Sequence, residues 1–175
     1  MPEEMMSRPS ISDGYVCRRA AEIIFPKVWG WMGRENSGCK QEDVMRDLTK
    51  IASAHRNGFE LAKGLERRGW MVDDLLVDIL ADTWVQDAID ELTNQWVRCL
   101  NIRPQFRIGD SVAVTSYWRS QATGTVVKVD EKLAQYGVRY PDMPKNAWAV
   151  VNFEDCTAPL PLPKSQPSAS IEGAA

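Results

Sequence analysis

The chain has 175 residues, 26% of them charged, and a formal net charge of −3. This balance argues against a protein that coats nucleic acid through bulk positive charge, and no apolar run approaches the roughly 20 residues of a membrane-spanning helix. The four cysteines lie far apart and form no C-x-x-C pair. We therefore expect neither a zinc knuckle nor a disulfide framework, but a reduced cytoplasmic protein without membrane attachment.

A flexible leader is expected over residues 1–9, followed by a helical domain over residues 10–103. Ser12 and Asp13 can cap a first helix, whose apolar stripe runs from Val16 to Trp31. Pro26 lies within this stripe and lacks a backbone N–H, so the helix is expected either to kink or to restart there.

A second helix is expected from Gln41, where acidic residues in the first turn suit the helix dipole. Its apolar face includes Ile51 and His55. The pair Asn57-Gly58 either breaks this helix or is tolerated inside it, and both outcomes stay open. The helical pattern then continues to a glycine at position 69, which is typical of a helix end.

Residues 73–100 carry two apolar stripes that do not fit one straight surface helix. Leu76 and Leu80 lie on the first stripe, and Ala88 and Trp96 lie on the second. At 100° per residue the two stripes point to nearly opposite sides. Residues 83–86 (TWVQ) match a capping box, which favours a helix start at that point. We therefore predict two helices with a break near residues 82–83, and about four helices in all.

Short runs of alternating residues predict strands after residue 104. The runs cover residues 107–115, 125–129, 136–140 and 148–153, with turn residues at 130–132 and 141–144 between them. Tyr136 and Tyr140 share the face of Val138, so we expect both rings to line the core of this module.

The order of these strands resembles an SH3-like β-barrel of the KOW and Tudor type. The matching pieces are Ile108-Gly109-Asp110 and the residues 124–130, 136–140 and 150–155. The resemblance implies a five-stranded barrel that binds proteins, peptides or nucleic acids through its loops. The small size of the chain, with a compact helical part and a tail, also resembles small uncharacterised phage and mobile-element proteins.

The expected fold class is therefore α+β. A helical bundle of about four helices over residues 10–103 precedes an SH3-like barrel over residues 104–157. Residues 158–175 are rich in proline, serine and alanine, a composition that predicts a disordered tail.

The rim of the expected barrel is the main candidate for partner binding. Exposed aromatic and loop residues are typical of such surfaces. An aromatic cage for a cationic ligand is the alternative there, because a ring face attracts a cation. The candidate partner-binding residues are Tyr117, Trp118, Arg119, Asp142, Met143 and Trp148.

Two charged clusters are further candidates. Asp74, Asp78 and Asp82 lie four residues apart on one flank of a helix, either as a solvated face or as an imitation of a phosphate backbone. Two arginine pairs would form a basic patch if their helices packed side by side. These residues are Arg18, Arg19, Arg67 and Arg68.

Nothing in the sequence indicates catalysis, a cofactor or a metal. His55 is the only histidine and lies on an apolar stripe, which favours a structural role. No nucleophile elbow and no glycine-rich phosphate loop are present. The thiol of Cys17 beside Arg18 and Arg19 could have a lowered pKa, with ordinary helix surface as the alternative.

The sequence therefore predicts a non-enzymatic interaction or adaptor protein that binds a protein partner through the barrel rim and the helical surface. A nucleic-acid-associated accessory factor is the second hypothesis, although the net charge does not favour it. The third is a phage or mobile-element inhibitor that uses the acidic helix face against a nucleic-acid-binding enzyme. The oligomeric state stays open.

Overall fold

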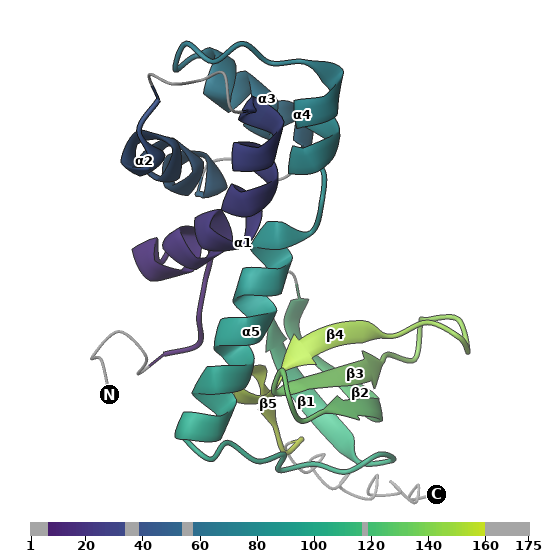
Figure 1. Cartoon of the computed structure of the whole chain (residues 1–175). Helices are drawn as coiled ribbons and strands as arrows, with labels where there is room; N and C mark the ends of the chain where they lie inside the picture. Colours follow the sequence, from purple (N-terminus) through teal and green to yellow (C-terminus); the bar gives the residue numbers. More distant parts are fainter. Residues whose placement is uncertain (1–6, 34–38, 54–57, 117–118, 160–175) are drawn as a thin grey trace, which may run out of the picture. The chain divides into compact units, whose positions relative to one another are not determined.

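A computed structural model describes residues 7–33, 39–53, 58–116 and 119–159. The chain divides into a helical unit, residues 1–103 with 131–134, and a sheet unit, residues 104–130 with 135–175 (Figure 1). The described part is α+β, as expected. It contains five α-helices followed by one five-stranded antiparallel sheet.

Helix α1 (Gly14–Met32) is continuous through Pro26 and changes direction along its length (Figure 1). Of the two outcomes expected at this proline, the restart is not observed, since one helix runs from Gly14 through Pro26 to Met32. Asp13 precedes the helix but makes no side-chain cap. Its carboxylate accepts a hydrogen bond from the backbone N of Ser10 at 2.8 Å instead.

Helix α2 (Gln41–Ala52) and helix α3 (Gly58–Glu66) divide the region that could have been one long helix. The described residues therefore contain five α-helices, where about four were predicted. Gly58 at the start of α3 lies directly against Ala81: a Cβ added at Gly58 would lie 2.6 Å from the backbone N of Ala81. Glycine is required here because α3 approaches the chain after α4 at backbone distance.

Helices α4 (Asp74–Leu80) and α5 (Trp84–Cys99) confirm the predicted break near residues 82–83. The predicted capping box is wrong, because Thr83 makes no cap and its hydroxyl contacts the carboxylate of Asp87 instead. A side-chain cap is present instead at the start of the preceding helix, α4. There the carboxylate of Asp73 accepts a hydrogen bond from the backbone N of Leu76 at 2.8 Å.

The core of the helical unit draws buried side chains from all five helices. Trp84, at the first position of α5, is the largest side chain that is almost fully buried, with 2% exposure. Its indole N–H donates to the carbonyl of Leu80 at 3.2 Å, so the ring also links α5 to α4. Leu76 and Leu80, the two residues named on the first predicted stripe, are buried, whereas Leu75 between the start of α4 and Leu76 is exposed.

The sheet has the strand order β4-β3-β2-β1-β5. Its strands are β1 (Ser111–Ser116), β2 (Arg119–Asp130), β3 (Gln135–Arg139), β4 (Ala149–Asn152) and β5 (Cys156–Thr157), with the 3-10 turn η2 (Phe153–Asp155) before β5. The expected number of strands is confirmed. β4 and β5 lie at opposite edges without a ladder between them, so the described strands form an open sheet rather than a closed barrel.

Two features of the predicted strand module have clear structural roles. Gly109 has a φ of 98°, and the carboxylate of Asp110 accepts from the backbone N of Arg107 at 2.7 Å, so the Ile108-Gly109-Asp110 motif is a turn into β1. Tyr136 is 1% exposed, and Tyr140 is also buried. Both tyrosines therefore line the core, as expected.

The chain ends extend beyond the described residues. Most of the expected leader and the tail from residue 160 lie outside them, as does His55. Within the expected leader, Pro9 is buried and Arg8 is half-buried. None of the helices described has both the length and the apolar character needed to cross a membrane.

Candidate interaction surface

The strongest candidate site is a basic and aromatic surface on strands β2, β3 and β4. We call it the sheet patch and define it by Lys128, Arg139, Met143, Lys145, Trp148 and Val150. The register pairs Lys128 with Gly137 and Gly137 with Val150, which places Lys128 and Val150 on one face, and Arg139 follows on the same face two residues after Gly137. Trp148 and Val150 are large apolar side chains with 47% and 65% exposure. Such side chains are candidates for contact with a partner.

Gly137 explains how Trp148 is held on this face. A Cβ added at Gly137 would lie 2.8 Å from the Cδ1 atom of Trp148 and 2.9 Å from the Cβ of Lys128. The indole therefore covers the bare backbone of β3 beside the stem of Lys128. Because the ring rests on the strand while half of it faces solvent, it is already positioned for a partner.

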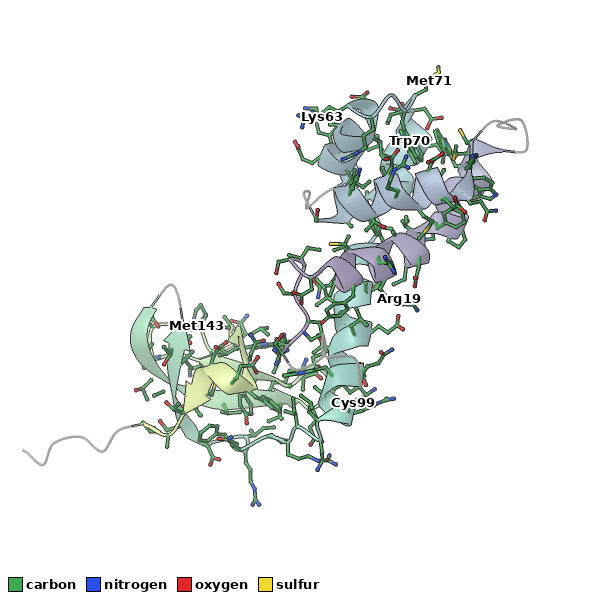
Figure 2. All side chains as sticks on the ribbon, turned by 90° about the vertical axis from the view of Figure 1, so that its left-hand side faces the viewer. Arg19, Lys63, Trp70, Met71, Cys99 and Met143 are labelled. Atoms are coloured by element: carbon green, nitrogen blue, oxygen red, sulfur yellow. The ribbon has the colours of Figure 1, made fainter. Side chains whose placement is uncertain are left out.

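A cleft of about 450 Å³ lies beside this face. Arg139, Met143 and Lys145 line it together with Tyr140 and Pro141. The turn that carries Met143 is closed by a hydrogen bond from its backbone N to the carbonyl of Tyr140 at 3.0 Å. Figure 2 shows Met143 beside the sheet. Three residues of the sheet patch thus line this cleft: the flexible apolar side chain of Met143 and the cations Arg139 and Lys145.

Charge is unevenly distributed over the sheet unit. Lys128, Arg139 and Lys145 belong to the sheet patch, whereas Glu154 and Asp155 lie in the η2 turn. Asp130, two residues after Lys128 on the same strand, ends the basic stretch. By register Lys128 and Arg139 share one face of the sheet, and Asp130 lies on that same face at its end.

The six predicted partner-binding residues are only partly brought together. Trp148 and Met143 belong to the sheet patch, and Asp142 lies in the same turn as Met143. Tyr117 and Trp118 lie outside the described residues, and only the backbone of Arg119, in β2, is described. Sequence reasoning missed Lys128, Arg139, Lys145 and Val150. The alternation of Val150 with buried Val151 was the one signal that could have indicated an exposed apolar residue.

The predicted acidic face separates into residues with different roles. Asp82 forms an ion pair with Lys27, and this contact, with a hydrogen bond from the backbone N of Thr83, lowers the pKa of its carboxyl. Asp74 and Asp78 are exposed on α4. Of the three aspartates, Asp82 therefore forms an ion pair within the helical unit.

The predicted basic residues are also engaged in part. Arg19 donates to both carboxylate oxygens of Glu91, at 2.9–3.0 Å, and this contact raises its pKa. Arg68 lies 3.7 Å from the carboxylate of Asp47. The main helical neighbours of α1 are α2, α4 and α5, while α3 packs mainly on α4. Arg18 and Arg67 are exposed on α1 and just after α3.

The helical unit has a groove lined by both apolar and charged residues, which sequence reasoning did not identify. It has a volume of about 410 Å³, and its walls come from the end of α1, from α2 and from the segment after α3. Trp31 and Trp70 line it, and their indole N–H groups donate to Asp73 and Asp47 at 3.0 Å. Met71 beside them is 91% exposed (Figure 2). The groove is the candidate site on the helical surface.

Both interpretations of Cys17 are corrected: the residue is 3% exposed, so it is not helix surface, and its pKa is not lowered. Burial, followed by the charge of Asp13, raises the pKa of this thiol, which donates to the carbonyl of Ile11 at 3.2 Å. Burial, followed by Asp155 and Glu154, raises the pKa of Cys156 to about 11. Arg18 and Arg19 do not lower the pKa of the neighbouring Cys17, because the Cys17 side chain is buried in the core.

This difference predicts a labelling pattern. At pH 8 iodoacetamide should modify exposed Cys39 and Cys99 at least roughly tenfold faster than Cys17 and Cys156, because only accessible thiolates react. Mass spectrometry of labelled peptides measures the four rates, and a sample in guanidinium chloride, where all four should react alike, is the control. Rapid native labelling of Cys17 would contradict its buried position.

No group of three or more potential metal ligands is present among the residues that the structure describes. Searches against family models, curated proteins and solved structures gave no match to this chain. The functional argument therefore depends on the sheet patch and the groove themselves.

Proposed function

We propose that the chain is a non-enzymatic interaction protein whose sheet patch binds an extended, acidic segment of a protein partner. The observation that carries the proposal is the exposed pair Trp148 and Val150 beside an edge strand, next to cations from three chain segments. The groove lined by Trp31 and Trp70 is a second contact region in this proposal.

The edge strand favours an extended segment. β4 forms a ladder with β3, and no strand on its other side is present in the described part of the sheet. An added strand would satisfy the outward backbone groups of β4, while its alternate side chains would pack on Trp148 and Val150. Lys128, Arg139 and Lys145 would favour carboxylates on that segment and increase the association rate.

The strand order supports the SH3-like architecture that the sequence resembles. Strands β1 to β4 form a meander, and β5 returns beside β1 after a 3-10 turn. SH3-like barrels have this connectivity. We include in the proposal that the sheet curves enough to close into such a barrel. Barrels of this kind use exposed aromatic residues to bind peptides.

Single-stranded nucleic acid is the second candidate. An exposed tryptophan next to cations is also suited to base stacking with phosphate contacts. The uneven charge of the sheet patch is the observation that favours it. Nuclease treatment and salt dependence distinguish the two candidates, because phosphate contacts make affinity fall steeply with salt.

Photo-crosslinking tests the proposal. A p-benzoylphenylalanine in place of Val150 should capture one protein in the cells that naturally produce the chain, and the crosslinked peptide should carry Asp or Glu. The same group in place of Thr115, which is exposed on β1, is the matched control and should not capture it. Capture that disappears after nuclease treatment would favour the second candidate, and equal capture from both positions would contradict a site on the sheet patch.

A further inference from the structure

A small cavity of about 280 Å³ lies at the end of α5, apart from the sheet patch. Its walls belong entirely to the helical unit: the last turns of α5, the residues that follow, and the turn between β2 and β3. The polar and charged lining residues are Asn94, Arg98, Asn101, Arg103, Glu131 and Lys132.

The first wall is fixed by the backbone at the end of α5. Asn101 adopts a left-handed conformation with φ of 50°, and the N–H of Ile102 donates to the carbonyl of Val97 at 3.0 Å. This Schellman-type ending satisfies terminal carbonyls of the helix, so Arg98 is not needed as their donor. Arg103 donates from Nε to the side-chain oxygen of Asn101 at 3.1 Å, which orients its guanidinium.

The second wall is held against α5 by Arg8. Its two terminal nitrogens donate to the carbonyls of Leu133 and Ala134, each at 2.8 Å. The same guanidinium lies 5.0 Å from the ring centroid of Trp96, within the range of a cation–π contact. Ala134 is buried and has a φ of 49°, so the turn has a defined conformation. Lys132 is thereby placed beside the end of α5.

The charges around the cavity are predominantly positive. Arg98, Arg103 and Lys132 face a single carboxylate in the lining, that of Glu131. Arg19, Arg46 and Arg68 each have a carboxylate partner within 4 Å. Within the described residues, no such ion pair involves Arg98 or Arg103. Arg98 and Arg103 therefore both line one concave site, and neither forms an ion pair within the described residues.

We propose that this cavity binds a phosphate group. Guanidinium groups match the oxygens of phosphate in geometry and charge, and the amides of Asn94 and Asn101 add neutral donors. The phosphate belongs either to a small phosphate compound or to a nucleic-acid backbone, and the two sources share the same contacts. This site is independent of the protein partner proposed for the sheet patch.

The test is a titration of the full chain with inorganic phosphate and, separately, with a ten-nucleotide single-stranded DNA at constant ionic strength. NMR signals of the Arg98 and Arg103 Nε–H groups should shift with saturable binding. The double variant R98Q/R103Q should weaken binding at least tenfold, and E131Q should tighten it roughly threefold, because it removes the opposing carboxylate. The double variant K40Q/K50Q changes the net charge equally at two exposed residues, one just before α2 and one within it, and should bind as the wild type does.

Weaker DNA binding in R98Q/R103Q would assign the phosphate to a nucleic-acid backbone, and binding of inorganic phosphate alone would assign it to a small compound. Thermal unfolding followed by circular dichroism checks that each variant keeps its fold. Wild-type affinity in R98Q/R103Q, an equal loss in K40Q/K50Q, or no saturable binding of either probe would overturn the proposal.

Discussion

Replacing Trp84 by alanine is expected to lower the free energy of unfolding by about 3–5 kcal/mol. The ring is 2% exposed in the core of the helical unit, and its N–H donates to the carbonyl of Leu80. The substitution leaves a cavity and removes the link between α4 and α5. Since native domains are stable by about 5–15 kcal/mol, this one change would remove a large part of the stability.

Urea unfolding followed by circular dichroism at 222 nm measures this loss. The comparison variant is Trp148→Ala, which removes the same side chain from a half-exposed position over Gly137 and should lower stability by no more than about 1–2 kcal/mol. Trp84→Phe keeps most of the volume and should fall between the two, which keeps the test informative if the alanine variant does not fold. Equal stability of the two alanine variants would contradict the burial of Trp84.

Replacing Tyr136 by phenylalanine is expected to destabilise the sheet unit by about 1–3 kcal/mol. Only the hydroxyl is removed, but it accepts hydrogen bonds from the backbone N–H groups of Gln105 and Phe106 at 2.9 and 3.0 Å. Packing of the ring against Phe153, with centroids 4.2 Å apart, is retained. The cost therefore comes from two backbone donors that lose their acceptor.

Hydrogen exchange measured by NMR separates this effect from a general loss of stability. The amides of Gln105 and Phe106 should lose protection in Tyr136→Phe by a larger factor than the amides of β2 and β3. Unchanged protection at these two amides would show that the tyrosine hydroxyl does not hold the segment before β1.

Periodicity predicted much of the helical unit, because burial of an apolar stripe depends on spacing along the chain. The break between α4 and α5 follows from two stripes on opposite sides. The capping box at Thr83 failed for a local reason: its hydroxyl bonds to Asp87, while Asp73 caps α4. A sequence pattern does not show which of several nearby polar side chains a given hydroxyl or backbone N–H will hydrogen-bond.

The sheet patch could be predicted only in part. Trp148 was identified because an aromatic residue near turn residues indicates an exposed ring. Lys128 and Val150 became part of the site through strand register, which places both beside Gly137. Register depends on the whole sheet, and a shift of one residue would move each side chain to the other face.

Residues from distant parts of the chain were the hardest to predict. The cavity at the end of α5 depends on Arg8, which is more than a hundred residues from the turn that it holds. The groove likewise combines Trp31, Asp47 and Trp70 from separate segments. No local pattern in the sequence indicates such contacts, because they follow from tertiary packing alone.

The most direct measurement is the affinity of the crosslinked partner for the wild-type chain and for the variants Trp148→Ala and Val150→Lys. Both exposed substitutions should weaken binding at least tenfold, a loss of about 1.4 kcal/mol or more, while Thr115→Lys should leave it unchanged. Unchanged affinity in both sheet-patch variants would contradict a partner-binding role for this surface.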